Sequence, residues 1–206
     1  MMKLILSSCD FHNEFSRKCI IDNLDKKIDS IRILFIPNER ASKKAIRSEK
    51  YYLRLQEFGF LHENIYIFDY YAPENFYGLD IDVIYISGGN TFQTFDRIKK
   101  RGFDTEIVRY VKNGVTYIGG SAGAHIASLN IEHVLKYDCN TAQMNDFTAL
   151  GLFSGIFVCH YTEERSLHYA ELKARGEYAV YALSNDDSVV VIDDKVEMFG
   201  NNKHGM

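Results

Sequence analysis

Cysteine is scarce in this chain, and its spacing argues against structural metal sites and disulfide frameworks. The 206 residues contain four cysteines, Cys9, Cys19, Cys139 and Cys159, and no two of them form a C-x-x-C pair. Zinc sites and small secreted frameworks both depend on closely spaced or regularly paired cysteines. We therefore expect reduced thiols and no structural metal.

Long apolar runs and an excess of basic residues are also lacking. The apolar run at 4–6 is too short for the core of a signal peptide and soon meets Asp10. No run approaches the roughly 20 apolar residues that a membrane-spanning helix needs. The formal net charge is −4, and no basic stripe interleaved with aromatic residues is visible. These absences predict a cytoplasmic protein that binds neither membranes nor nucleic acids.

The remaining composition is that of an ordinary globular protein. Hydrophobic residues make up 46% of the chain and charged residues 25%, which are usual fractions for a soluble domain. No internal repeat, low-complexity segment or linker interrupts the sequence. We predict a single domain over residues 1–206, which is long enough to bury a sizeable core.

Strand-like and helix-like segments alternate along the chain. Short apolar runs predict strands at 3–8, 31–36, 65–68, 81–86, 115–118, 156–159, 180–183, 188–192 and 196–199. Helical spacing of apolar residues predicts helices at 11–28, 41–58, 91–100, 106–112 and 165–175, with another directly after Ser121. This order predicts an α/β fold of three layers, α/β/α, around a mostly parallel sheet.

The stretch VTYIGGSAGAHIASLN, at 115–130, combines strand, tight turn and helix around one hydroxyl group. Its G-x-S-x-G motif is typical of a nucleophile elbow, in which small neighbours let Ser121 adopt a strained backbone with Oγ exposed. The N–H of Ala122, at the start of the following helix, would face the same space and favour developing negative charge. The alternative is a glycine-rich turn that packs a helix on a sheet, with Ser121 as a cap.

Three predicted strands end in residues of compatible chemistry. Gly88, Gly89 and Asn90 follow one strand, Ser121 follows the next, and His160 ends another. Ligands of open α/β sheets bind outside the carboxyl ends of the strands. The three strand ends together therefore predict a site more strongly than the elbow motif does alone.

A serine nucleophile needs a base within hydrogen-bond reach, and His160 is the best placed histidine because it ends an apolar strand. We expect His125, one turn after Ser121, to pack or to support the site from behind. The other histidines lie in loops, near element ends, on a charged helix or in a stretch of undefined structure: His12, His62, His133, His168 and His204.

A carboxylate usually holds such a histidine in one tautomer. Between Ser121 and His160 the candidates are Glu132, Asp138 and Asp146, and their spacing does not choose among them. Asp146 precedes a packing segment and could be a cap. Asp138 lies in a polar loop, where an orienting carboxylate is plausible.

The landmarks of the chain resemble those of the S51 serine peptidases, the family of alpha-aspartyl dipeptidase. They span nearly the whole sequence: LILSS, ILFIP, SGGNTFQ, YIGGSAGA, DFTALGL and CHYTEER. The resemblance implies a cytoplasmic serine exopeptidase with a Ser-Asp/Glu-His triad. It also implies an α/β fold like that of the class I glutamine amidotransferases.

The resemblance also implies roles for individual residues. Ser121 falls on the nucleophile, His160 on the base and Asp138 nearest the acidic member, with Glu132 in reserve. Gly89 and Asn90 fall on the turn that faces the nucleophile. An N–H of that turn and the N–H of Ala122 would form the oxyanion hole. No cofactor or metal is implied.

The sequence departs from alpha-aspartyl dipeptidase after His160, where it moves almost directly into the next helix. A preference for an N-terminal Asp would need a cation, and Arg165 could supply it or could pair with Glu163 or Glu164 on the helix surface. The sequence thus predicts a serine exopeptidase that cleaves dipeptides or short peptides through an acyl-enzyme, as a monomer or homodimer. The alternatives are a catalytically silent small-molecule-binding protein on the same fold, and another serine hydrolase such as an esterase or amidase.

Overall fold

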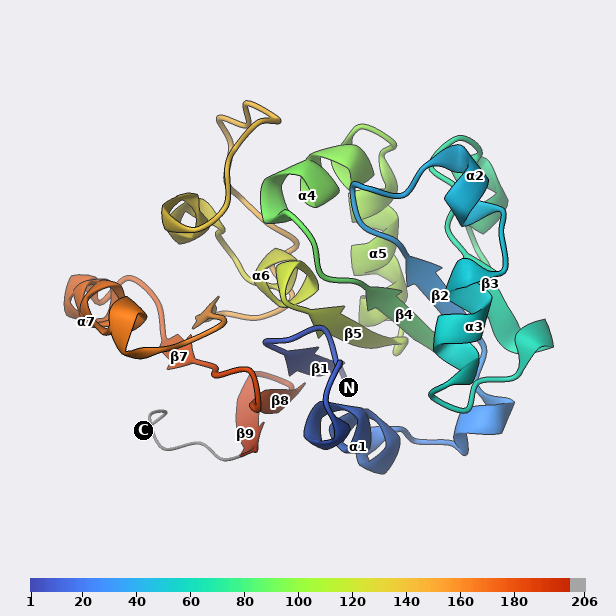
Figure 1. Ribbon diagram of the computed structural model, residues 1–206, viewed down its shortest axis with the longest axis horizontal. Helices are drawn as coiled ribbons and strands as arrows, with labels where there is room; N and C mark the ends of the chain where they lie inside the picture. The colour runs from blue at the N-terminus through green and yellow to red at the C-terminus, as the bar shows by residue number, and fades with distance from the viewer. Residues whose placement is uncertain (201–206) are drawn as a thin grey trace.

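The computed structural model describes residues 1–200, which form a seven-stranded sheet and a separate two-stranded sheet (Figure 1). The large sheet has the order β3-β2-β4-β5-β1-β8-β9. Its first five strands are parallel, and β8 and β9 join antiparallel at one edge. The strands are β1 Lys3–Ser7, β2 Ile33–Ile36, β3 Ile65–Ile67, β4 Val83–Ile86, β5 Thr116–Gly120, β8 Ser188–Ile192 and β9 Lys195–Phe199.

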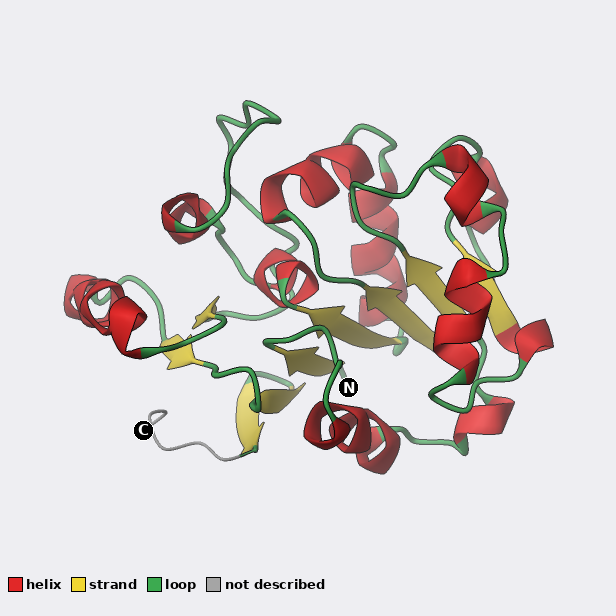
Figure 2. Cartoon of the chain, viewed as in Figure 1, coloured by secondary structure: helices red, strands yellow, loops and turns green. Residues whose placement is uncertain are grey.

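Helices cover both faces of the large sheet, as Figures 1 and 2 show, with α4 and α6 on one side and α1 on the other. Strands β2, β4 and β5 are buried along their whole length, because helices on both faces leave a parallel sheet no solvent-exposed side. The α-helices are α1 Glu14–Asn23, α2 Lys43–Ile46, α3 Lys50–Gln56, α4 Thr91–Lys99, α5 Phe103–Lys112, α6 Ala122–Ala127 and α7 Ser166–Arg175. No helix within residues 1–200 has the length and apolar character to cross a membrane.

The strand that leads to His160 belongs to the two-stranded sheet, whereas the sequence pattern suggested a strand of the main sheet. β6 (Ile156–Val158) pairs in parallel with β7 (Val180–Ala182), and α7 connects them. This unit lies beside the sheet at the left of Figure 1. β6 nevertheless contacts α6, so the chain after Val158 still arrives near the elbow.

Two predicted helices are shorter than the apolar spacing suggests. Asp10 and Phe11 have positive φ values of 56° and 57°, so the first helix begins only after Asn13, whose Oδ1 accepts a hydrogen bond from the N–H of Ser16 at 2.8 Å. The helix expected at 41–58 divides into α2 and α3, which are separated around Arg47. Short 3₁₀ helices occupy Ile28–Ser30, His62–Asn64, Pro73–Phe76, Glu132–Lys136 and Glu163–Arg165.

Glycines allow α6 to approach the end of the sheet closely. A Cβ atom on Gly123 would lie 2.2 Å from the carbonyl oxygen of Ile86 at the end of β4. A Cβ on Gly119 would lie 2.6 Å from the carbonyl oxygen of Gly123. The hydroxyl of Tyr117 donates a hydrogen bond to that same carbonyl at 2.7 Å. The small residues of the elbow motif are therefore required by the contact between helix and strands.

We expect Gly123→Ala to destabilise the fold by about 3 kcal/mol or more, because the added methyl group meets backbone that cannot move independently. Urea unfolding measures the change. The matched control is Gly78→Ala. Gly78 has φ +66°, and no atom of residues 1–200 lies within 4 Å of its Cβ position, so only backbone strain of about 1 kcal/mol is expected there. Equal losses in the two variants would contradict the close contact.

Candidate active site

Ser121 occupies a strained turn between β5 and α6. Its φ of 47° and ψ of −102° are rare for a residue with a side chain, and such strain persists only where the surrounding structure enforces it. The N–H of Ser121 donates to the carbonyl of Ser7, at the end of β1, at 2.7 Å. Gly120 packs so closely on Asp10 that a Cβ would lie 2.0 Å from its Oδ1. These contacts hold the hydroxyl at the apex of a tight strand-to-helix turn.

His160 meets Ser121 two residues after the end of β6. Its Nε2 lies 2.9 Å from Ser121 Oγ. His160 also has a positive φ, 52°, and its backbone N–H donates to Ser8 Oγ at 2.6 Å. The end of β1 thus contacts both residues, through the carbonyl of Ser7 and the hydroxyl of Ser8. The structure brings together the nucleophile and base that the sequence predicts.

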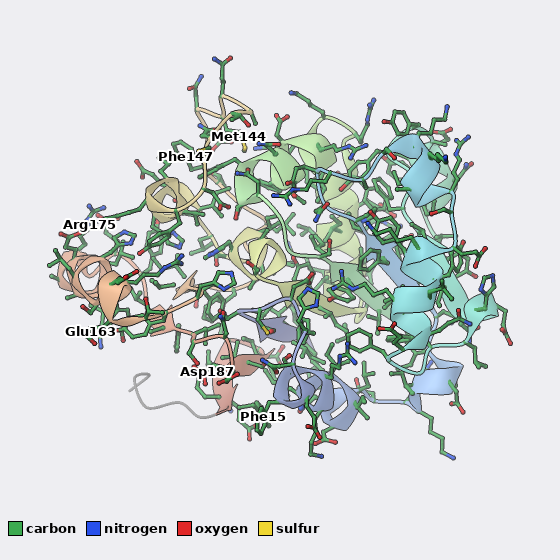
Figure 3. The ribbon with its side chains drawn as sticks, in the orientation of Figure 1. Phe15, Met144, Phe147, Glu163, Arg175 and Asp187 are labelled. Atoms are coloured by element: carbon green, nitrogen blue, oxygen red, sulfur yellow. The ribbon has the colours of Figure 1, made fainter. Side chains whose placement is uncertain are left out.

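Asn185 is the partner of the other imidazole nitrogen. Its Oδ1 lies 2.6 Å from His160 Nδ1. An amide oxygen only accepts hydrogen bonds, so Nδ1 carries the proton and Nε2 presents its lone pair to Ser121 Oγ. Asn13 Nδ2 donates to the backbone carbonyl of Asn185 at 2.6 Å, and this contact fixes the loop. Asp187, labelled in Figure 3, lies in the same loop just before β8.

Asp138 has a different partner from the predicted one. Its Oδ2 accepts a hydrogen bond from the backbone N–H of Thr91, at the start of α4, at 2.7 Å. Asn90 Nδ2 donates to the carbonyl of Cys139 at 3.0 Å. These contacts attach the Asp138 loop to α4, and no hydrogen bond between Asp138 and His160 is present within residues 1–200. The turn of Asn185 folds onto His160 instead.

The reserve acid, Glu132, lies elsewhere. It begins the 3₁₀ helix Glu132–Lys136 and lines a separate cavity of about 260 Å³ with His133 and His168. Asp146 is an exposed residue whose carboxylate pairs with Lys99 at 3.1 Å. Sequence reasoning missed Asn185 because the search was confined to carboxylates between Ser121 and His160. The sequence did indicate a polar turn at 185–187 directly after a strand, which is where functional residues of such a fold often lie.

The glycine turn after β4 faces the nucleophile across a cavity of about 550 Å³, which Gly88, Gly89, Asn90, Ser121 and His160 line together. The N–H of Asn90 donates to Glu39 Oε2 at 3.1 Å, and its Oδ1 caps α4 at Gln93.

The neighbouring amides leave donors for an oxyanion. The N–H groups of Gly88 and Gly89 have no acceptor within residues 1–200. Ala122 is the first residue of α6, where N–H groups lack intrahelical partners. These groups, rather than the amide of Asn90, are the available oxyanion donors.

Arg165 stands behind the cavity wall. Its guanidinium lies 3.9 Å from the ring centroid of Tyr137 and donates to the carbonyl of Cys159. Tyr137 lines the 550 Å³ cavity, whereas Arg165 is not among the lining residues. Two other arginines, Arg40 and Arg54, line this cavity, and Arg54 Nη2 pairs with Asp10 Oδ2 at 2.8 Å. Arg165 therefore stabilises the cavity wall through its contacts with Tyr137 and the carbonyl of Cys159.

Two other histidines, His125 on α6 and His133 in the 3₁₀ helix Glu132–Lys136, contact each other. His125 is buried, as the sequence predicts, and its Nδ1 has no hydrogen-bond partner within residues 1–200. Burial lowers its pKa well below the ordinary value. His133 stacks edge-on against it with ring centroids 5.5 Å apart and bonds to the carbonyl of Phe157 at 2.9 Å. Burial lowers the pKa of His133 to about 4. His204, the remaining candidate near the C-terminus, lies outside the described residues.

The described part of the chain contains no set of side chains arranged to bind a metal ion. No group of three or more His, Cys, Asp or Glu side chains is arranged to hold an ion there. Cys19 and Cys159 are buried, and burial raises the pKa of each thiol to about 12. Within residues 1–200 all four cysteines are free.

The fold and the site define an α/β protein with a serine at the apex of a strained strand-to-helix turn and a histidine hydrogen-bonded to its hydroxyl. The sequence pattern of peptidase family S51 matches residues 3–199. The chain belongs to this family.

Relatives within the family carry peptidase names. An uncharacterized peptidase of Pasteurella multocida is 32% identical over 128 residues, which cover 59% of this chain and 61% of the relative. A peptidase E of Citrobacter koseri is 40% identical over 83 residues, which cover 40% of this chain and 35% of the relative. The matched segments thus span less than two thirds of these relatives' own length.

Solved structures share the fold over nearly the whole chain. A peptidase E candidate from Listeria monocytogenes EGD-e has a TM-score of 0.74 at 23% identity, covering 98% of this chain and 100% of that one. A peptidase from an acI-B1 Actinobacterium has a TM-score of 0.64 at 15% identity, covering 98% and 88%. The predicted α/β class with a mostly parallel sheet is confirmed.

The low pKa of His133 predicts acid sensitivity of the fold. His133 stays neutral in the folded state down to pH of about 4, whereas an unfolded histidine takes up a proton near pH 6.5. The contribution of neutral His133 to the free energy of unfolding is complete above pH 6.5. It is lost as pH falls toward 4, and the loss reaches about 2 kcal/mol by pH 5. Urea unfolding at pH 7 and pH 5 measures the loss.

His133→Gln retains a donor for the Phe157 carbonyl and removes the titration, so it should lose less stability between these pH values than the wild type. His12→Gln is the control for the substitution itself, because the His12 side chain is 69% exposed. An unaltered slope in His133→Gln would assign the acid sensitivity to other groups, such as His125.

Proposed function

We propose that this protein is a serine-type peptidase that hydrolyses dipeptides or short peptides through an acyl-enzyme. The observation that carries the proposal is the 2.9 Å contact between Ser121 Oγ and His160 Nε2 in a nucleophile elbow. A hydroxyl becomes an effective nucleophile when a base accepts its proton at this distance. Membership of family S51 and the peptidase names of the relatives support the same class of reaction.

The proposed reaction has two halves. His160 Nε2 takes the proton of Ser121 as Oγ bonds to the scissile carbonyl carbon, and the carbonyl oxygen becomes an anion held by backbone N–H groups. Collapse breaks the C–N bond, and His160 gives the proton to the departing amine. Water then attacks the ester with the same base, which releases the acid and restores the serine. Loss of one oxyanion donor in such a site costs roughly 3 kcal/mol in the barrier.

The size of the cavity favours small substrates. Its volume of about 550 Å³ lies within the usual range of small-molecule sites, roughly 300–1,000 Å³. This supports cleavage of dipeptides rather than of folded proteins. Specificity for an N-terminal Asp would require a cation other than Arg165 in its present position, so we propose Asp-X cleavage only as one outcome of a substrate panel.

One observation favours the alternative of a catalytically silent binding protein. The partner of His160 Nδ1 is a neutral amide, Asn185, which orients the ring but adds no negative charge to stabilise an imidazolium ion. The elbow and cavity would then serve to hold a small metabolite. A covalent probe of the serine separates the two functions, because only an activated hydroxyl reacts.

We expect the wild type to react with a fluorophosphonate probe at one residue and to cleave members of a dipeptide panel that includes Asp-X, neutral and basic N-terminal residues. Ser121→Ala should remove labelling and reduce turnover to background, a loss of up to roughly a million-fold in a comparable site. Mass spectrometry locates the label and circular dichroism checks the fold. A wild type without labelling or cleavage would support the silent binder.

Asn185→Asp should accelerate the reaction if the neutral amide limits it. In a comparable triad, replacing the carboxylate by an amide lowers kcat by about 10⁴, so we expect the reverse change to raise kcat/KM by at least about tenfold. Asn185→Ala should instead lower kcat, because Nδ1 loses its acceptor. Labelling rates and kcat/KM on the same dipeptide measure both changes. If neither variant differs from the wild type, Asn185 does not orient the base.

A further inference from the structure

A second cavity, which shares no lining residue with the catalytic one, lies between α7, β6 and the 3₁₀ helix Glu132–Lys136. Its volume is about 260 Å³, against about 550 Å³ for the catalytic cavity. Lys136 pairs with Glu171 of α7 at 3.5 Å, which joins the two helices that lie side by side at the left of Figure 1. Tyr137 separates the cavities: it lines the catalytic one, and its hydroxyl bonds at 2.5 Å to Nδ1 of His168, which lines the second.

Positive charge gathers around His168 in this cavity. His168 is only 7% exposed, and because Tyr137 engages its Nδ1, Nε2 is the ring nitrogen left for a ligand. Nε2 has no hydrogen-bond partner within residues 1–200. Burial lowers the pKa of His168, and the nearby charges of Lys136 and Arg175 lower it further, with Glu171 opposing them. A neutral imidazole therefore lies close to two cations.

Arg175 is the cation that is available to an anionic ligand. It is labelled in Figure 3, at the end of α7, and it lines the second cavity. Within residues 1–200 it forms no ion pair, whereas Lys136 already pairs with Glu171. Arg175 and the free nitrogen of His168 thus offer two donors to one carboxylate group.

The same cavity contains groups that suit an ammonium ion. Glu132 and Glu177 line it, and neither carboxylate forms an ion pair within residues 1–200. His133 Nε2 donates to the carbonyl of Phe157 at 2.9 Å, which leaves the lone pair of Nδ1 as an acceptor. Because burial lowers the pKa of His133 to about 4, this lone pair stays free of a proton at neutral pH.

The rest of the lining is apolar and the volume is small. The side chains without charge include Leu135, Ile156, Leu172 and Tyr178. The cavity is smaller than the roughly 300–1,000 Å³ typical of sites for drug-sized ligands, so it favours a ligand smaller than a dipeptide. Its two basic side chains and two carboxylates balance each other. The matching ligand has one positive group, one negative group and an apolar part.

A free α-amino acid has this combination, since its ammonium group only donates hydrogen bonds and its carboxylate only accepts them. We propose that the second cavity binds a free α-amino acid with an apolar side chain. The carboxylate contacts Arg175 and His168 Nε2, and the ammonium group contacts the two glutamates and His133 Nδ1. This binding site goes beyond the proposed peptidase function and does not depend on it, because it shares no residue with the cavity of Ser121.

Isothermal titration calorimetry of the wild type with L-leucine tests the inference. We expect saturable binding of one leucine per chain. Leucinamide lacks the carboxylate and N-acetylleucine lacks the ammonium group, so each should bind at least about tenfold more weakly, as expected for the loss of a hydrogen bond to a charged group. Absence of saturable leucine binding, or equal affinity for the three compounds, would overturn the inference.

Arg175→Gln tests whether leucine binds in this cavity. The variant should weaken leucine binding by about tenfold, because an amide replaces the charged partner of the carboxylate. Lys173→Gln is the matched control, since Lys173 is an exposed cation of the same helix that does not line the cavity, and its affinity should equal that of the wild type. Unchanged affinity in Arg175→Gln would overturn the inference and place leucine elsewhere, such as in the catalytic cavity.

Fluorophosphonate labelling of the same three proteins keeps this inference separate from the proposed function. We expect equal labelling rates, because Arg175 and Lys173 lie outside the catalytic cavity. A wild type that binds leucine but is not labelled would contradict the peptidase and support the amino-acid site.

Discussion

The site depends on the contacts made by the end of β1. The carbonyl of Ser7 accepts the N–H of Ser121, and the hydroxyl of Ser8 accepts the N–H of His160. The two acceptors belong to adjacent residues. The backbones of Ser121 and His160 are therefore both held by the same end of β1. Because Ser121 and His160 both have positive φ values, neither conformation would persist without such restraint. The 2.9 Å contact between the two side chains follows from this common anchor.

The charged groups that line the cavity differ in whether the protein neutralises them. The charge of the buried Asp10 is neutralised by Arg54, and the hydroxyl of Tyr85 donates a hydrogen bond to it, so Asp10 adds no net charge to the cavity. The amide of Asn185 orients His160 without a charge. The negative charge that remains lies on Asp138. The imidazole of His160 is therefore oriented by a neutral group and has no carboxylate beside its Nδ1 within residues 1–200.

Local sequence patterns predicted most of the elements, and failed where tertiary contacts override them. The buried strands β2, β4 and β5 are continuous apolar runs, which predict parallel strands of an α/β sheet. The strand at Ile156–Val158 has the same appearance but pairs only with β7, because a run of three residues says nothing about its partner. The helix expected from residue 11 begins later because the chain turns at Asp10 and Phe11. This turn packs Asp10 against Gly120, and the spacing of apolar residues along the chain does not predict such a contact.

The sequence by itself indicated Ser121 as the candidate nucleophile, because the G-x-S-x-G spacing specifies a tight strand-to-helix turn with one hydroxyl at its apex. It also indicated His160, since a polar residue at the end of an apolar strand lies at the functional edge of such a sheet. The tertiary structure alone decided the partner of His160, because Asn185 is close to it only after the chain has passed through α7 and β7. It likewise separated Asp138 from the imidazole, since the hydrogen bonds of Thr91 and Asn90 hold that loop on α4. Spacing along a chain specifies the geometry of one turn, whereas the meeting of distant loops depends on how whole elements pack.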